Sequence, residues 1–108
     1  MNPIRPEKLD VLEKILDHVG SIYGFSPEQL LDRDTPRRGV TKRLAFSRYL
    51  SMHLAIKYAD FSRWGAERLF EFSHPMGFIA LKKIEAARDS DPELAAIIER
   101  AEEEMGND

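Results

Sequence analysis

Apolar residues recur at steps of three and four along most of the chain, the spacing typical of amphipathic α-helices. Between Pro6 and Tyr23 the apolar stripe consists of Leu9, Leu12, Leu16, Val19 and Tyr23, widened by Ile15 and Ile22. No segment alternates apolar and polar residues at period two for long enough to predict a strand. The pattern therefore predicts an all-α fold of five to six helices, arranged as a single domain over residues 1–108.

A short second helix is predicted directly after Gly24, which is well placed to end the first helix in the left-handed conformation. Ser26 can cap the new helix, and Pro27 suits its first position. Gln29 completes the spacing of a capping box. Residues 31–39 are polar and contain Pro36 and Gly39, so we expect a loop there.

Residues 40–59 form the longest predicted helix, with two apolar rows on adjacent faces. The rows are Phe46, Leu50, Leu54 and Tyr58, and Ala45, Tyr49, Met52 and Ile56. Two adjacent rows indicate a central helix that is contacted from two sides. Its first turns carry Lys42, Arg43 and Arg48, cations that the helix dipole disfavours there, which points to a functional reason for keeping them.

Residues 60–88 have the outline of a helix-turn-helix. A short helix comes first, a tight corner follows at Ser73-His74-Pro75, and a second helix runs to about Arg88. The helical repeat of the second helix predicts a buried face of Gly77, Ala80, Leu81 and Ile84. The residues that point the other way are Pro75, Ile79, Lys82, Lys83 and Ala86.

Two further expectations complete the fold. The last helix is predicted over about residues 92–105, after the capping-box spacing of Ser90-Asp91-Pro92-Glu93. The chain has one tryptophan, Trp64, which we expect in the core, where it packs the first helix of the motif onto the long helix.

The net charge of −3 conceals three blocks of different sign. Residues 1–34 carry 4 Lys+Arg and 7 Asp+Glu, residues 35–68 carry 8 and 2, and residues 69–108 carry 4 and 10. A basic middle between acidic ends is expected if one local surface, and not the whole molecule, faces a polyanion. The alternative is that charges merely solvate the helix faces.

Several classes of function have no support in the sequence. His18, His53 and His74 are far apart on no common ligand spacing, and there is no cysteine, so we expect no metal site. No phosphate loop and no nucleophile-base set is visible, so we expect neither an enzyme nor a cofactor. No apolar run approaches the roughly 20 residues of a membrane span, and the N-terminus has no secretory signal, which predicts a cytoplasmic protein without a membrane partner.

Three segments carry a resemblance to a known family. They are residues 15–31 (Ile-Leu-Asp-His-Val-Gly-Ser-Ile-Tyr-Gly-Phe-Ser-Pro-Glu-Gln-Leu-Leu), Arg37-Arg38-Gly39-Val40 with the long helix behind it, and Ser73-His74 followed by Ala80-Leu81-Lys82-Lys83-Ile84-Glu85. Together, over about residues 10–90, they resemble the C-terminal DNA-binding domain of the bacterial replication initiator DnaA, in the Trp-repressor-like group of helix-turn-helix folds. The resemblance implies a small nucleoid-associated DNA-binding protein, without the ATPase part of the initiator, that acts in replication initiation, in its control or in transcriptional regulation.

The resemblance also implies which residues meet double-stranded DNA. Arg37 or Arg38 takes the place of the basic-loop arginine that enters the minor groove, and Lys42 and Arg43 hold phosphates from the start of the long helix. At the corner, His74 matches the family's histidine and Ser73 stands where the family has aspartate. Lys82 lies on the outward face, as a phosphate contact. Binding is either sequence-specific or non-specific.

This chain departs from the family on the surface that would read bases. Pro75 and Met76 replace two threonines, Phe72 replaces an arginine, and Phe70 and Glu71 replace a glycine pair. The outward face thus offers lysines for phosphates but almost no bidentate side chain for base edges. The apolar cluster of Phe70, Phe72, Met76, Phe78 and Ile79 instead suits a protein partner. The second interpretation is therefore a protein-interaction module that acts on a replication-initiation protein or its regulators.

Overall fold

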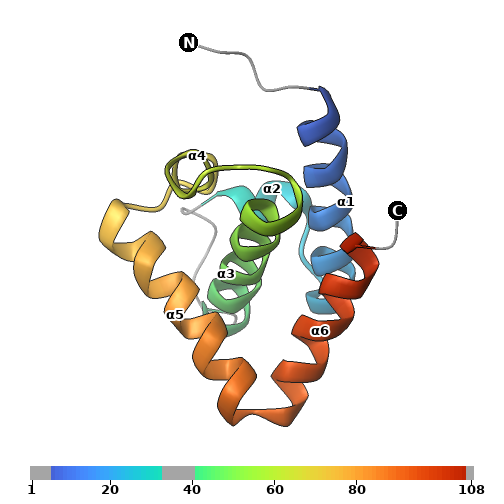
Figure 1. Ribbon diagram of the computed structural model, residues 1–108, viewed down its shortest axis with the longest axis vertical. Helices are drawn as coiled ribbons and strands as arrows, with labels where there is room; N and C mark the ends of the chain where they lie inside the picture. The colour runs from blue at the N-terminus through green and yellow to red at the C-terminus, as the bar shows by residue number, and fades with distance from the viewer. Residues whose placement is uncertain (1–5, 33–40, 107–108) are drawn as a thin grey trace.

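The computed structural model describes residues 6–32 and 41–106, and every regular element within these ranges is an α-helix (Figure 1). The helices are α1 (Pro6–Tyr23), α2 (Pro27–Leu31), α3 (Thr41–Tyr58), α4 (Arg63–Leu69), α5 (His74–Ser90) and α6 (Pro92–Gly106). The predicted all-α fold of five to six helices is confirmed. Arg37 and Arg38, on which part of the DNA prediction falls, lie outside the described residues.

The local signals at the start of the chain produce the expected helix ends. Gly24 has φ +81°, and the amides of Gly24 and Phe25 both donate to the Gly20 carbonyl, at 2.7 and 3.0 Å, which closes α1. At α2 the Gln29 amide donates to Ser26 Oγ (3.2 Å), and the Ser26 amide donates to Gln29 Oε1 (2.8 Å). The predicted capping box is therefore present.

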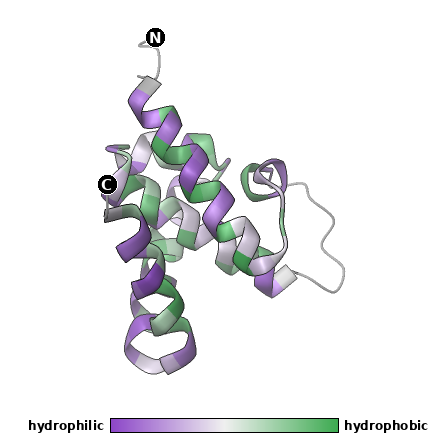
Figure 2. Cartoon of the chain, turned by 90° about the vertical axis from the view of Figure 1, so that its right-hand side faces the viewer, coloured by the Kyte–Doolittle hydropathy of each residue, from purple (hydrophilic) through white to green (hydrophobic). Residues whose placement is uncertain are grey.

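Helix α3 is the centre of the molecule and contacts all five other helices (Figure 1). Its buried apolar residues pack against those of α1, α5 and α6. Figure 2 shows that the outer sides of α1 and α6 are largely polar. The largest fully buried apolar side chains are Phe70, Ile15, Leu30, Leu50, Met52, Leu54, Ile84, Ile98 and Val19. The predicted central position of the long helix is confirmed.

Some apolar residues expected in the core are on the surface. Leu9 and Ile22 remain 46% and 37% exposed at the ends of the α1 stripe, and Trp64 is 64% exposed. The prediction for Trp64 is wrong because Ala66, Glu67 and Phe70 occupy the inner side of α4 and its C-terminal cap. At 100° per residue, Trp64 then lies well away from that side.

Arg48 is a buried cation that joins two helix ends. Its Nε donates to the Leu30 carbonyl at 3.0 Å, and a second guanidinium nitrogen donates to the Phe70 carbonyl. The guanidinium carbon lies 4.6 Å from the centre of the Phe72 ring. Burial lowers the pKa of Arg48, while the charge of Glu71 acts in the opposite direction. Arg48 therefore ties the ends of α2 and α4 to α3 and is withdrawn from any basic surface.

Candidate functional site

The predicted corner is formed by α4, the turn of residues 70–73 and the start of α5. Ser62 caps α4 by accepting from the Gly65 amide (3.0 Å), and Ser73 caps α5 by accepting from the Met76 amide (3.3 Å). His74 is the first residue of α5, and Pro75 follows in the first turn, where no intrahelical donor is required. Glu71 turns the chain with φ 58°, an uncommon conformation for a residue with a side chain.

A buried carboxylate holds this corner together. Glu67 is 2% exposed, and its Oε1 lies 3.0 Å from His74 Nδ1. Arg63 Nη2 lies 3.1 Å from His74 Nε2, and because a guanidinium can only donate, Nε2 must accept. Nδ1 then carries the proton and donates to Glu67. The contacts thus define one tautomer of His74, held between the cation Arg63 and the carboxylate.

The second oxygen of Glu67 is packed against the backbone of α5. Among the described residues Oε2 has no hydrogen-bond partner, and Arg63 Nε lies 3.6 Å away as an ion pair. A Cβ atom on Gly77 would lie 2.1 Å from Oε2 and 2.5 Å from Glu67 Cγ. Glycine at position 77 is therefore what lets the carboxylate fit between α4 and α5.

Aromatic and cationic groups share the exposed side of the corner. The Trp64 and His74 rings stack, with centroids 4.5 Å apart and planes 13° from parallel. Phe78, 48% exposed, lies one turn further along α5. Lys82 Nζ is 4.8 Å and the Arg63 guanidinium carbon is 5.8 Å from the centre of its ring, both within cation-π range. We call the surface of Arg63, Trp64, His74, Phe78 and Lys82 the aromatic corner.

The rest of α5 follows the predicted helical repeat. Gly77, Ala80 and Ile84 are buried and Leu81 is half-buried, while Pro75, Ile79, Lys82, Lys83 and Ala86 are exposed. The predicted apolar patch needs a correction, because Phe70 is fully buried. Phe72 is half-buried, with its ring 5.8 Å from that of Tyr49. Phe78 and Ile79 remain exposed and Met76 is half-buried, so the patch is smaller than predicted.

The other predicted cations lie at the start of α3. Lys42 and Arg43 are both exposed, as a phosphate contact would require. Arg43 Nη2 also donates to the Tyr23 carbonyl at the end of α1 (2.8 Å), a favourable position for a cation. Arg43 therefore has a structural role beside the DNA contact predicted for it.

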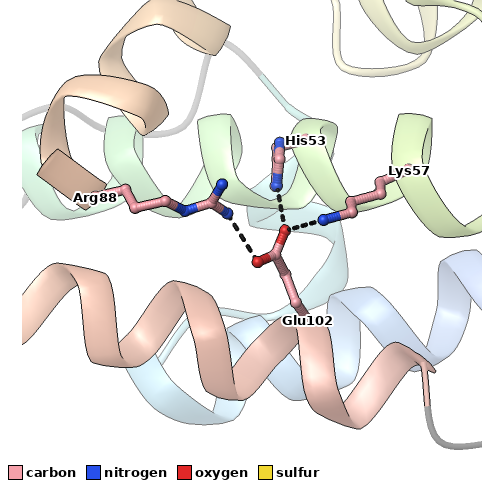
Figure 3. A network of polar contacts seen from close by, with 4 residues as sticks. All are labelled: His53, Lys57, Arg88 and Glu102. Atoms are coloured by element: carbon pink, nitrogen blue, oxygen red, sulfur yellow. Dashed lines mark hydrogen bonds and ion pairs between the residues drawn. The ribbon is translucent and has the colours of Figure 1, made fainter.

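A second polar cluster lies at the other end of α5, where α3, α5 and α6 meet (Figure 3). Glu102 Oε2 accepts from Lys57 Nζ (2.8 Å) and lies 3.0 Å from His53 Nε2, while Oε1 accepts from Arg88 Nη2 (2.8 Å). Burial raises the pKa of Glu102, but the bonds from Lys57 and His53 and the charge of Arg88 outweigh it and lower the pKa to about 2. The same hydrogen bond raises the pKa of Lys57.

A hollow of about 410 Å³ adjoins this cluster. It is lined by His53, Ile56, Lys57, Leu81, Ile84, Glu85 and Arg88. The cationic groups in this lining already face Glu102, so the cluster is best explained as an electrostatic clamp between helices and not as a ligand site.

Sequence reasoning missed Arg63, Trp64 and Glu67 as members of the site. Trp64 faces outward because Ala66 and Phe70 set the buried side of α4, and that burial depends on how α4 packs on α3. The contact of Glu67 with His74 had no sequence signal either, because the turn brings together residues seven positions apart.

No protein-family model, curated protein or solved structure matches this chain at a significant level. Within residues 6–32 and 41–106, no helix is both long and apolar enough to cross a membrane. The same residues contain no group of three or more His, Cys, Asp or Glu side chains that could hold a metal ion.

Proposed function

We propose that this protein binds duplex DNA through the basic segment before α3 and the corner between α4 and α5, and acts in replication initiation, in its control or in transcriptional regulation. The observation that carries the proposal is that α5 starts at a capped and exposed corner, Ser73-His74, and has Lys82 and Lys83 exposed along its outward face. Exposed cations on such a helix are suited to the phosphates that flank a groove.

The corner also carries an excess of positive charge. Residues 62–83 carry four Lys+Arg and two Asp+Glu, and one of the two acids, Glu67, is buried inside the corner. The outward face of α5 has lysines but almost no side chain suited to bidentate contact with base edges. Binding should therefore depend strongly on salt and only weakly on sequence.

The test is a fluorescence-anisotropy titration of random duplex and of duplex with initiator-type binding sites, each at two salt concentrations. We expect affinity for both duplexes to fall steeply with salt, and the R37A/R38A double variant to reduce the slope of log K against log salt by about one to two. Arg100→Ala, which removes one positive charge at an exposed position on α6, is the control and should leave the slope unchanged. Absence of duplex binding at low salt would refute the proposal.

A second candidate function is supported by the exposed apolar residues Phe78 and Ile79, which are 48% and 44% exposed side by side on α5. On this reading the scaffold is a protein-interaction module that acts on a replication-initiation protein or its regulators. The double variant F78S/I79S should then lose a partner captured from its host, or lose self-association in sedimentation, while its melting temperature stays close to that of the wild type. Unchanged association would exclude this candidate.

A further inference from the structure

We propose that the aromatic corner holds an unpaired base of a nucleic-acid strand: Trp64 provides the stacking face, and Lys82 with Arg63 meets the neighbouring phosphates. The inference rests on the proposed DNA-binding function and names the ligand of the same site more closely. That ligand is a single-stranded segment, either free or opened from a duplex.

The geometry of Trp64 is the first support. His74 covers one face of the indole at 4.5 Å, yet the residue stays 64% exposed, so its opposite face is open to solvent. Together with Phe78, which is 48% exposed on the same corner, it forms an exposed aromatic patch of the kind that marks binding sites. Stacking of a base on an aromatic side chain is a known way to bind single strands without regard to sequence.

The cations around Phe78 are the second support. Lys82 and Arg63 both lie within cation-π range of this ring, and Lys83 is exposed beside them. Residues 62–83, which include the corner, carry four Lys+Arg and two Asp+Glu, whereas the whole protein has a net charge of −3. An aromatic face beside cations matches a ligand that alternates flat rings with phosphates.

The chemistry of α5 favours an unpaired base over a paired one. In a duplex the faces of the bases are covered by their neighbours, and only the edges are accessible in the grooves. Edge recognition uses hydrogen-bonding side chains, and the outward face of α5 offers only Lys82 and Lys83 for it, with no arginine, asparagine or glutamine. An unstacked base offers the face that Trp64 can contact.

The platform is held in place before a ligand arrives. Glu67 accepts from His74 Nδ1, which fixes the imidazole plane on which Trp64 stacks. Gly77 lets the carboxylate sit between the two helices. Because the rings are already ordered, binding loses less side-chain entropy.

Trp64 is the only tryptophan of the chain, so its fluorescence reports on this site alone. The experiment titrates the full chain with an oligothymidine of about 15 nucleotides, about the largest single-strand site on one small domain. A hairpin whose loop is a non-nucleotide linker, so that every base is paired, and inorganic polyphosphate of equal charge are titrated in parallel. We expect the single strand to quench Trp64 strongly, the hairpin to quench weakly, and polyphosphate to leave the emission unchanged.

Variants test the contact itself through the anisotropy of a labelled oligothymidine. Trp64→Ala should weaken binding about tenfold, the loss expected for one stacked base, whereas Trp64→Phe should recover most of the affinity. Lys82→Ala should lower the slope of log K against log salt by about one. Leu9→Ala, at an exposed apolar position on α1, is the matched control and should bind like the wild type.

Three results would overturn the inference: no quenching by the single strand, equal quenching by polyphosphate or by the hairpin, or unchanged affinity in Trp64→Ala. Because Trp64→Phe and the wild-type quenching do not depend on the folding of Trp64→Ala, the test holds even if that variant is unstable. The two proposals can fail separately. Duplex binding without single-strand quenching removes the platform alone, and single-strand quenching without duplex binding removes the duplex function alone.

Discussion

Two glutamates connect α5 to its neighbours, one near each end of the helix, and their surroundings differ. Glu102 accepts hydrogen bonds at both carboxylate oxygens, from Lys57 and Arg88, with His53 as a third partner (Figure 3). Glu67 has the polar side chains of His74 and Arg63 beside it, and one of its oxygens has no hydrogen bond within the described chain. The first carboxylate is therefore surrounded by positive charge, and the second is only partly satisfied.

This difference indicates that the Glu102 cluster stabilises the fold, whereas the Glu67 cluster belongs to a candidate functional site. The three partners of Glu102 turn toward the carboxylate, so the cluster contributes mainly to the free energy of folding. The Glu67 cluster instead adjoins an exposed aromatic ring, since Trp64, which is 64% exposed, stacks on His74. A buried polar atom without a hydrogen-bond partner is uncommon in a folded protein, so the Glu67 oxygen that lacks one within the described residues, beside this exposed ring, marks the corner as the better candidate site.

The largest change in the free energy of unfolding is expected when Glu102 loses its charge. Glu102→Gln should lower the free energy of unfolding by about 2–3 kcal/mol at pH 7, because three cationic or hydrogen-bonding partners then lack a counter-charge. Glu67→Gln should change it by less than about 1 kcal/mol, since an amide oxygen can still accept from His74. Urea unfolding of both variants measures the contrast. Equal losses would show that the two clusters do not differ in kind.

The free energy of unfolding should depend on pH through the protonation of Glu102. Its pKa is lowered from 4.5 to about 2 in the folded protein, so the stabilisation is fully present above pH 4.5 and is lost as the pH falls toward 2. The difference in unfolding free energy between the wild type and Glu102→Gln should accordingly shrink over this range. Thermal unfolding at a series of pH values tests this. A difference that stays constant from pH 6 to pH 3 would contradict the assignment.

Because Glu67 packs directly against Gly77, substitutions at the two positions should have non-additive effects on the free energy of unfolding. Gly77→Ala alone should destabilise by about 1–2 kcal/mol, because its Cβ displaces the Glu67 side chain. In a Glu67→Ala background the same change should be neutral or stabilising, since the space is free and alanine favours a helix. A double-mutant cycle should then give a coupling free energy of about 1 kcal/mol or more. Additive effects would mean that the two residues do not compete for one space.

The smallest effect on stability is expected from a substitution on the exposed side of the corner. Trp64→Phe should change the free energy of unfolding by less than about 0.5 kcal/mol, because the side chain is largely in solvent. Chemical denaturation followed by circular dichroism measures this without relying on tryptophan emission. A loss above about 2 kcal/mol would place Trp64 with the structural residues after all.

Much of the fold could be predicted from local signals. The capping box at Ser26, the left-handed Gly24 and the repeat of α5 each depend on residues within a few positions of one another. At the start of α6 the predicted first residue, at about position 92, was right, but the predicted capping box from Ser90 to Glu93 was wrong. Asp91 Oδ1 accepts from the Glu93 and Leu94 amides, while Ser90 ends α5 and donates to the Ala86 carbonyl.

The site was harder to predict because its contacts cross the turn. Ser73 and His74 were expected at the corner, and they are there. Trp64 was placed inside because large aromatic side chains are usually buried, and the seven residues of α4 give the helical repeat little weight against that preference. The burial of Phe70 likewise depends on how α4 sits on α3, which no local pattern specifies.

Arg48 has a consequence for local unfolding. Its guanidinium bonds the carbonyls of Leu30 and Phe70, residues 40 positions apart at the ends of two short helices. Neither α2 nor α4 can open without leaving part of this buried cation unpaired, so the two helices should behave as one cooperative unit. Their slowest amide protons should then exchange with deuterium at a common opening free energy.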